Sequence, residues 1–218
     1  SWEGGITSDI HSGGLEFSHA NDVNAAGWVV GTNSDFVPGY FISQFRPYLR
    51  DPAGGWIDLG TLGGGSGFAE AVNDHQSVVG TARNASEQTR GFYYSQATGM
   101  LELPTFGGPL TDPRDIDNQE RVVGGSMDAS SSYRPFVMLP GGMLDLGTLG
   151  GPSGTARAIN EHGEIVGASK DASDVQRARP CGCSSAGTMA SAQCRDAAPS
   201  SEGAKLSMCM SCLLYTSP

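Results

Sequence analysis

The sequence predicts an all-β protein, a β-propeller-like array of four-stranded repeats of about 44 residues, and two recurring motifs support this. DLGTLGG stands at Asp58–Gly64 and Asp145–Gly151, with a degraded copy, ELPTFGG, at Glu102–Gly108. A Val-rich segment that ends in glycine recurs at the same interval, for example at Ala71–Gly80. Four short antiparallel strands in about 40–45 residues are typical of one propeller blade.

Each repeat is expected to contain four strands separated by glycine turns. In the later part of the chain these are Phe136–Leu139, Met143–Leu146, Ala156–Ile159 and Glu164–Gly167. Strands this short, with alternating polar and apolar residues, need one buried face. Since a single blade cannot bury both faces, we expect the Val-Val-Gly strands and the Leu of each DLG to form a core between blades. An open β-solenoid of the same repeat is the alternative architecture.

The repeats divide residues 1–179 into periods at about 9–57, 58–101, 102–144 and 145–179, or about three and a half blades. The first period is longer, and its extra residues fall in Thr32–Phe45. Asp9–Gly14 stands where a degraded DLGTLGG belongs, so we expect the chain to open midway through a blade. An array with an uncovered strand edge is expected to self-associate.

The repeat pattern stops near residue 179. Arg177 fits it, but residue 179 is not aromatic and no further DLGTLGG follows, while all five cysteines lie after residue 180. We expect residues 180–218 to be a non-native or disordered tail, with 212–218 derived from a sequencing adapter. Cys181 with Cys183, or Cys209 with Cys212, could be a thiol pair for a metal, but this stretch offers no fold to fix the ligand geometry.

Composition narrows the classes of partner. The chain has 32 glycines, 17% charged residues and a net charge of −10. This acidity argues against a nucleic-acid surface, which needs a basic patch, and against docking on anionic lipid. The sequence contains no run of 18 or more apolar residues, so it predicts no membrane span. Because the chain begins at Ser1 without a signal peptide, we interpret it as a fragment or a mature chain.

Two sets of repeated residues are expected to be structural. An arginine and an acid recur 11 or 12 positions apart, and each pair is predicted to form a cross-strand ion pair of about 0.2–1 kcal/mol. A further position, at the hairpin turn, is predicted to bond back to its own backbone. The pairs are Arg46 with Asp58, Arg90 with Glu102, and Arg134 with Asp145, and the turn residues are Asn24, Asn73, Asp117 and Asn160.

The long segment Thr32–Phe45 is the best ligand candidate. Its aromatic side chains, Phe36, Tyr40, Phe41 and Phe45, suit contact with a surface glycan or a protein. The alternative is that they pack as an extended hairpin or cover an open edge. We predict no catalytic residue, cofactor or metal site, because no catalytic motif is present and His75 and His162 occupy equivalent turns in separate blades.

The Arg-x-aromatic triplets, DLGTLGG and AINEHGEIVG (Ala158–Gly167) together resemble the HAF-type repeat family, probable extracellular repeats of bacteria. The resemblance covers roughly Asp9–Arg179. Pro104 replaces a glycine, Asp117 replaces an asparagine, and the family's His-Ala-Phe triplet appears as Arg-Pro-Tyr, Arg-Gly-Phe and Arg-Pro-Phe. The resemblance implies a secreted or surface protein without a defined catalytic residue.

The leading functional interpretation is a non-enzymatic extracellular repeat protein that acts as a binding or structural scaffold. The alternative is a fragment of a carbohydrate-active propeller enzyme whose catalytic residues lie outside this chain. An enzyme is expected to gather an irregular cluster of acids or histidines at the centre of the array from different blades. A scaffold is expected to carry only repeat-consensus residues there.

Overall fold

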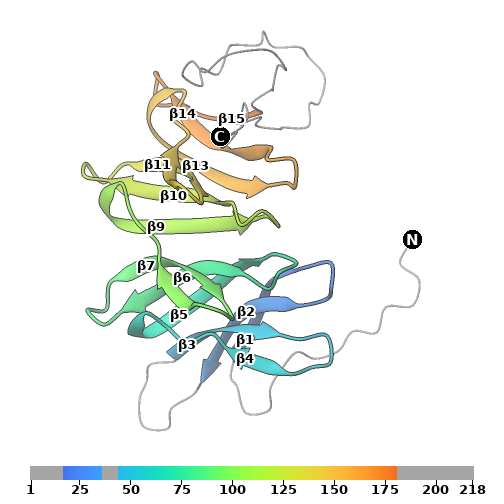
Figure 1. Cartoon of the computed structure of the whole chain (residues 1–218). Helices are drawn as coiled ribbons and strands as arrows, with labels where there is room; N and C mark the ends of the chain where they lie inside the picture. Colours follow the sequence, from blue (N-terminus) through green and yellow to red (C-terminus); the bar gives the residue numbers. More distant parts are fainter. Residues whose placement is uncertain (1–16, 36–43, 181–218) are drawn as a thin grey trace.

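The computed structural model describes residues 17–35 and 44–180, and this part of the chain folds into four antiparallel sheets (Figure 1). The first contains β1 (Phe17–Val23), β2 (Val29–Asp35), β3 (Gln44–Arg50) and β4 (Trp56–Asp58). The second contains β5 (Gly63–Val72), β6 (Val78–Asn84), β7 (Thr89–Ser95) and β8 (Gly99–Glu102). The third contains β9 (Gly107–Ile116), β10 (Val122–Asp128), β11 (Tyr133–Leu139) and β12 (Gly142–Asp145), and the fourth contains β13 (Gly150–Ile159), β14 (Ile165–Asp171) and β15 (Gln176–Pro180).

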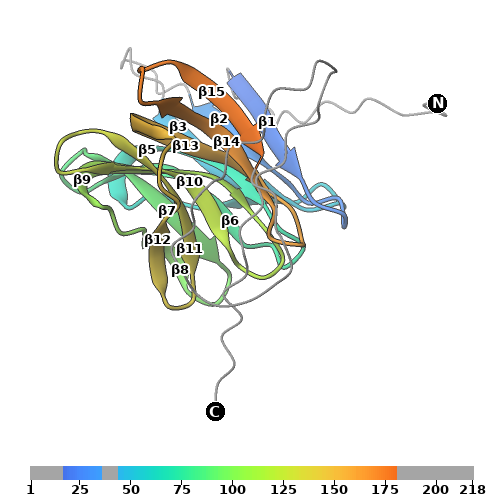
Figure 2. The same cartoon turned by 90° about the horizontal axis from the view of Figure 1, so that it is seen from above.

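The predicted all-β, propeller-like class is confirmed. Strands pair in chain order within each sheet, so the backbone hydrogen-bond ladders stay within one repeat. A β-solenoid would instead pair strands of successive repeats, so the alternative is not what the chain adopts. The sheets stack one on the next along the chain in Figure 1, and they overlie one another in Figure 2. No helix in the described ranges is long and apolar enough to cross a membrane.

The motif DLGTLGG lies across the boundary between two sheets. Asp58 ends β4, and Gly63 begins β5. The predicted periods therefore start about five residues before the sheets do, and the glycine link joins blades instead of lying inside one. The two final glycines have separate reasons: Gly63 has a φ of 101°, which favours glycine, and a Cβ on Gly64 would lie 2.5 Å from the carbonyl oxygen of Asn84.

The core lies between successive sheets, as predicted. We call the three interfaces the first, second and third junctions, in chain order. Val78 and Val79 are both fully buried, and because they point to opposite faces of β6, Val78 packs in the first junction and Val79 in the second. Leu59 and Leu103, from the DLG motif and its degraded copy, are buried in the same two cores. Each fully buried apolar side chain contributes about 1.5–3 kcal/mol.

A β-bulge follows from the glycine that ends each Val-rich segment. A Cβ on Gly80 would lie 2.1 Å from the carbonyl oxygen of Phe68 on the neighbouring strand, so only glycine fits there. The register of β5 with β6 shifts at this point, which leaves Glu70 without a partner in the ladder. The same shift occurs in the other sheets, and we call the four unpaired positions the bulge row: Asn21, Glu70, Arg114 and Arg157.

The bulge row lies where the sheets approach one another. The first strands of successive sheets are in contact: β1 with β5, β5 with β9, and β9 with β13. Bulges redirect the chain and the side chain of the extra residue. The fold therefore brings one non-repeating position from every sheet to a shared edge.

Candidate functional site

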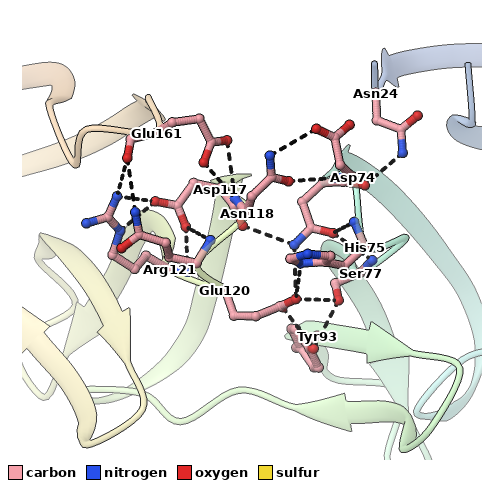
Figure 3. Close-up of polar contacts among 12 residues, drawn as sticks. Asn24, Asp74, His75, Ser77, Tyr93, Asp117, Asn118, Glu120, Arg121 and Glu161 are labelled. Atoms are coloured by element: carbon pink, nitrogen blue, oxygen red, sulfur yellow. Dashed lines mark hydrogen bonds and ion pairs between the residues drawn. The ribbon is translucent and has the colours of Figure 1, made fainter. Parts of the chain in front are cut away.

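The predicted turn residues have the structural role expected of them, and they also join the sheets (Figure 3). The side-chain oxygen of Asn73 accepts hydrogen bonds from the backbone amides of His75 and Ser77, at 3.0 and 2.9 Å. Its side-chain nitrogen donates to the carbonyl oxygen of Asp117 in the next sheet, at 3.0 Å. Asn24 bonds in the same two ways, and Asn160 closes its own turn. These residues are accounted for as turns and bridges.

In a second set of bonds, the side chain comes from the later turn and accepts from a backbone amide of the earlier one. The backbone amide of Ala25 donates to the Asp74 carboxylate at 2.9 Å, and the amide of Asp74 donates to the Asn118 side chain at 2.8 Å. The amide of Asn118 donates to the Glu161 carboxylate at 3.3 Å. Side chains of both neighbouring turns thus bond to the backbone of the other, which fixes the register of each sheet on the next.

Glu120 is the centre of a polar cluster between two sheets (Figure 3). Its carboxylate accepts from Asn73 at 3.1 Å and from the hydroxyls of Ser77 and Tyr93 at 3.0 Å, and it lies 3.5 Å from Nδ1 of His75. Burial raises the pKa of Tyr93, Ser77 lowers it and Glu120 raises it. All four partners belong to the preceding sheet, so we interpret this cluster as a fastening of the second junction.

Two of the three predicted ion pairs are present. Nε of Arg90 lies 3.1 Å from the Glu102 carboxylate, and Nη2 of Arg134 lies 2.9 Å from that of Asp145. The acids stand opposite the aromatic of each triplet in the strand register, so each arginine reaches diagonally. Arg46 and Asp58 are both described, and they form no such pair. The Asp58 carboxylate instead accepts from the amide of Gly60 at 2.8 Å.

Of the four aromatic ligand candidates, Phe36, Tyr40 and Phe41 lie outside the described residues, and Phe45 is described. Its ring packs on that of Phe68 in the next sheet, with the ring centroids 5.1 Å apart and the planes tilted by 32°. Phe45 therefore bridges the first junction, which agrees with the packing alternative. Phe68 remains 40% exposed, so this aromatic pair is partly open to solvent. The role of Phe45 in ligand binding stays a prediction.

The third junction contains a surface hollow of about 330 Å³ at the equivalent place. Its walls come from two sheets and carry mostly polar side chains. They are Asp112 and Arg114 of β9, Tyr133 of β11, and Thr155 and Arg157 of β13. Two residues of the bulge row thus line one cavity.

The hollow exists because of small residues where the first junction has large ones. Phe45 and Tyr133 each directly precede the arginine of a triplet, so they occupy the same repeat position. The partner of Phe45 is Phe68, whereas Thr155 stands at that position beside Tyr133. Gly125 lies behind both residues and lets them approach closely, since a Cβ there would lie 3.0 Å from Cδ1 of Tyr133 and 3.2 Å from Thr155.

The side chains that line the hollow carry two positive charges, on Arg114 and Arg157, and one negative charge, on Asp112. Arg114 forms an ion pair with Asp112 and lies 3.9 Å from the Glu70 carboxylate. Burial raises the pKa of Asp112 and of Glu70, and the Arg114 guanidinium lowers both. Arg157 is exposed and makes no ion pair or hydrogen bond within the described part of the chain. One guanidinium is therefore available to a ligand.

Sequence reasoning missed the bulge row. The third strand of a repeat, Ala156–Ile159 in the later part of the chain, is predicted without a bulge, so Arg157 counts only as a polar residue of an alternating strand. The signal was the residue before Ala71 and its equivalents, which changes from amide to acid to base among repeats whose neighbours stay similar. In the described ranges no group of three or more histidine, cysteine or acidic residues is arranged to hold a metal ion.

Comparison with known proteins gives distant structural likenesses and no sequence relative. No protein-family model matches the chain, and no curated protein matches it. The solved structure of TolB from Acinetobacter baumannii is similar, with 14% sequence identity and a TM-score of 0.48. The match covers 72% of this chain and 38% of that one, so this chain spans well under half the length of TolB.

Proposed function

We propose that this chain is part of a non-enzymatic extracellular or cell-surface repeat protein of the HAF type, which binds a glycan or a protein through the edge that carries the bulge row. The observation that carries this proposal is the contrast between constant and varied positions. The residues of the turns, cores and glycine links recur in sheet after sheet. The bulge row varies in chemistry along the chain, from an amide to an acid and then to two bases.

The geometry supports recognition at this edge. A scaffold needs similar contacts at every junction, and the bulge row does not supply them: Asn21 and Glu70 contact the next sheet, whereas Arg157 makes no such contact in the described part of the chain. Side chains on a rigid β-framework are held in fixed relative positions, which favours selective binding. The extracellular location and the HAF relationship rest on the sequence motifs alone.

A screen of immobilised full-length chain against surface glycans and proteins tests the proposal. The informative variant is the triple substitution Glu70→Gln, Arg114→Gln and Arg157→Gln, which removes the charges of the bulge row and keeps a polar side chain at each position. Its matched control is Arg83→Gln with Glu87→Gln, an exposed ion pair at a hairpin turn. Binding that the triple variant loses and the control keeps supports the proposal. Equal binding by both variants contradicts it.

The enzyme-fragment alternative retains one supporting observation. Glu70 and Asp112 come from different sheets to the same edge around Arg114, which is the irregular acidic cluster expected of an enzyme. Incubation of the chain with oligosaccharides, followed by detection of new reducing ends, separates the two functions. Product formation that Glu70→Gln abolishes would favour the enzyme, and binding without turnover favours the scaffold.

A further inference from the structure

The hollow of the third junction points to a specific class of ligand. Resting on the proposed function, we propose that it binds a sugar unit that bears a carboxylate, such as a uronic acid residue within a polysaccharide. The carboxylate would pair with Arg157, the sugar hydroxyls would bond to Asp112 and Thr155, and one face of the ring would lie against Tyr133.

The charge of the hollow supports a single anionic group. Arg114 is already engaged by Asp112 and Glu70, which leaves Arg157 as the lining guanidinium that has no ion-pair partner in the described part of the chain. A guanidinium presents two parallel N–H donors that match a carboxylate. The chain as a whole carries a net charge of −10, which repels acidic polymers at long range. At physiological salt that repulsion is screened beyond about 8 Å, so the local contact with Arg157 decides binding.

The other walls favour a sugar over an acidic peptide. Asp112 accepts hydrogen bonds when ionised, and Thr155 both donates and accepts, so together they suit a ligand rich in hydroxyl groups. Only Tyr133 offers an extended apolar surface, which one face of a sugar ring can cover. Peptide side chains are bound mainly through apolar anchor pockets, and the residues that line this hollow form none.

The size of the hollow also fits. At about 330 Å³ it lies at the lower end of the range for small-ligand pockets, which suits one sugar unit of a longer chain. The hollow is bounded by the bulge row on β9 and β13, so neighbouring units of a polysaccharide can extend along the edge. Glu70 and Asn21 stand at the equivalent bulge positions of the other sheets.

Calorimetric titration of the full-length chain tests this inference. The probe is a trimer of galacturonic acid, compared with its methyl ester, with a neutral galactose trimer and with a glutamate tripeptide. Arg157→Gln should weaken binding of the acidic trimer about tenfold or more, because it removes a charge-assisted hydrogen bond. Gly125→Thr, which introduces the residue found at the equivalent Thr81, should fill the hollow and abolish binding. Arg83→Gln is the matched control and should bind normally.

The outcomes are separable. Binding of the acidic trimer that both hollow variants impair, with weak binding of the ester and the tripeptide, supports the inference. Equal affinity for the ester would contradict the role given to the carboxylate. Equal affinity for the tripeptide would contradict the inference that the ligand is a sugar. If the wild type binds no acidic sugar, this inference fails. The proposed function fails separately, if the triple bulge-row variant captures the same ligands as its control. Circular dichroism of Gly125→Thr establishes that the variant is folded.

Discussion

The first and third junctions have the same repeat architecture, but the first is closed by aromatic side chains and the third is open at a polar hollow. At the first junction the rings of Phe45 and Phe68 pack together and fill the space beside the bulge row. At the third junction Tyr133 faces Thr155, Gly125 carries no side chain, and a hollow of about 330 Å³ remains. The backbone plan is shared, so a few side chains decide whether a junction is closed or open.

The bulge row follows the same contrast. Asn21 donates to the carbonyl oxygen of Ala69 at 2.6 Å, which uses its amide to hold the first junction together. Across the second junction Glu70 and Arg114 have opposite charges, 3.9 Å apart. Across the third, Arg114 and Arg157 have the same charge, and this does not stabilise stacking. The chain therefore uses its varied positions for cohesion at one end and leaves them available for binding at the other.

The largest expected effect concerns the cores. Phe92 is fully buried in the first junction, whose core is the larger, so Phe92→Ala should lower the free energy of unfolding by about 3–5 kcal/mol. Ile165→Val in the third junction should cost about 0.5–1.5 kcal/mol. Urea denaturation followed by circular dichroism measures both. A loss below 1 kcal/mol for Phe92→Ala would show that the junction cores do not hold the array.

Substitutions at two adjacent glycines distinguish a position that the fold requires from a position beside the candidate site. A Cβ on Gly124 would lie 2.2 Å from the carbonyl oxygen of Asp112, so Gly124→Ala should destabilise the fold by about 1–3 kcal/mol. A Cβ on Gly125 meets only the side chains of Tyr133 and Thr155, so Gly125→Ala should change stability by less than about 1 kcal/mol. Thermal and urea denaturation of the two variants give the comparison. Equal losses would mean that Gly125 is as structural as Gly124.

The acids beside Arg114 predict a pH dependence. Burial raises the pKa of Glu70 and Asp112 above their ordinary values of 4.5 and 3.8, so the folded state holds these protons more tightly than the unfolded state. Their contribution to stability is complete below the ordinary values and is lost as the pH rises through the raised values. Arg114→Gln removes the influence that lowers both pKa values and should cost about 1 kcal/mol or less at pH 7.

Arg157→Gln provides the control for this measurement. Because Arg157 is exposed and unpaired within the described ranges, its loss should change the free energy of unfolding by no more than about 0.5 kcal/mol. The free energy of unfolding, measured between pH 4 and pH 7, should fall more steeply with pH in Arg114→Gln than in the wild type. In Arg157→Gln it should fall as it does in the wild type. Asp112→Asn should flatten the decline. A parallel response of both arginine variants would place them in the same structural role.

The last comparison exchanges the aromatic residues of the two junctions. Phe45→Ala removes one ring of the aromatic pair and should cost about 0.5–1.5 kcal/mol. Thr155→Phe places a ring beside Tyr133 and should stabilise the third junction by a similar amount while closing the hollow. Denaturation measures the stabilities, and titration with the galacturonic acid trimer measures the closure. Retained binding in a stabilised Thr155→Phe would contradict the location of the site.

Much of the fold could be predicted from sequence because its determinants repeat. DLGTLGG, the Val-Val-Gly strands and the turn asparagines each obey a local rule, and repetition makes these rules visible. The phase of the blades could not be predicted in the same way. A period has no marked beginning in the sequence, and Asp58 and Gly63 belong to different sheets although one motif contains both.

The candidate site could not be predicted for the opposite reason. Its residues are those that break the repeat, and a single sequence gives no way to tell a varied binding position from a tolerated surface change. Glu70 and Arg114 come together only because a bulge removes each from its ladder and the first strands are in contact. The prediction of an ion pair between Arg46 and Asp58 also fails at this level, because spacing alone does not fix where an exposed side chain lies.

A crystal structure of the full-length chain grown with the galacturonic acid trimer tests the central claim most directly. The account predicts that a sugar carboxylate lies within hydrogen-bond distance of Arg157, with the ring beside Tyr133 and the Phe45–Phe68 contact unchanged. A third junction closed by an ion pair between Arg157 and Asp112, with the sugar absent or bound elsewhere, would contradict it.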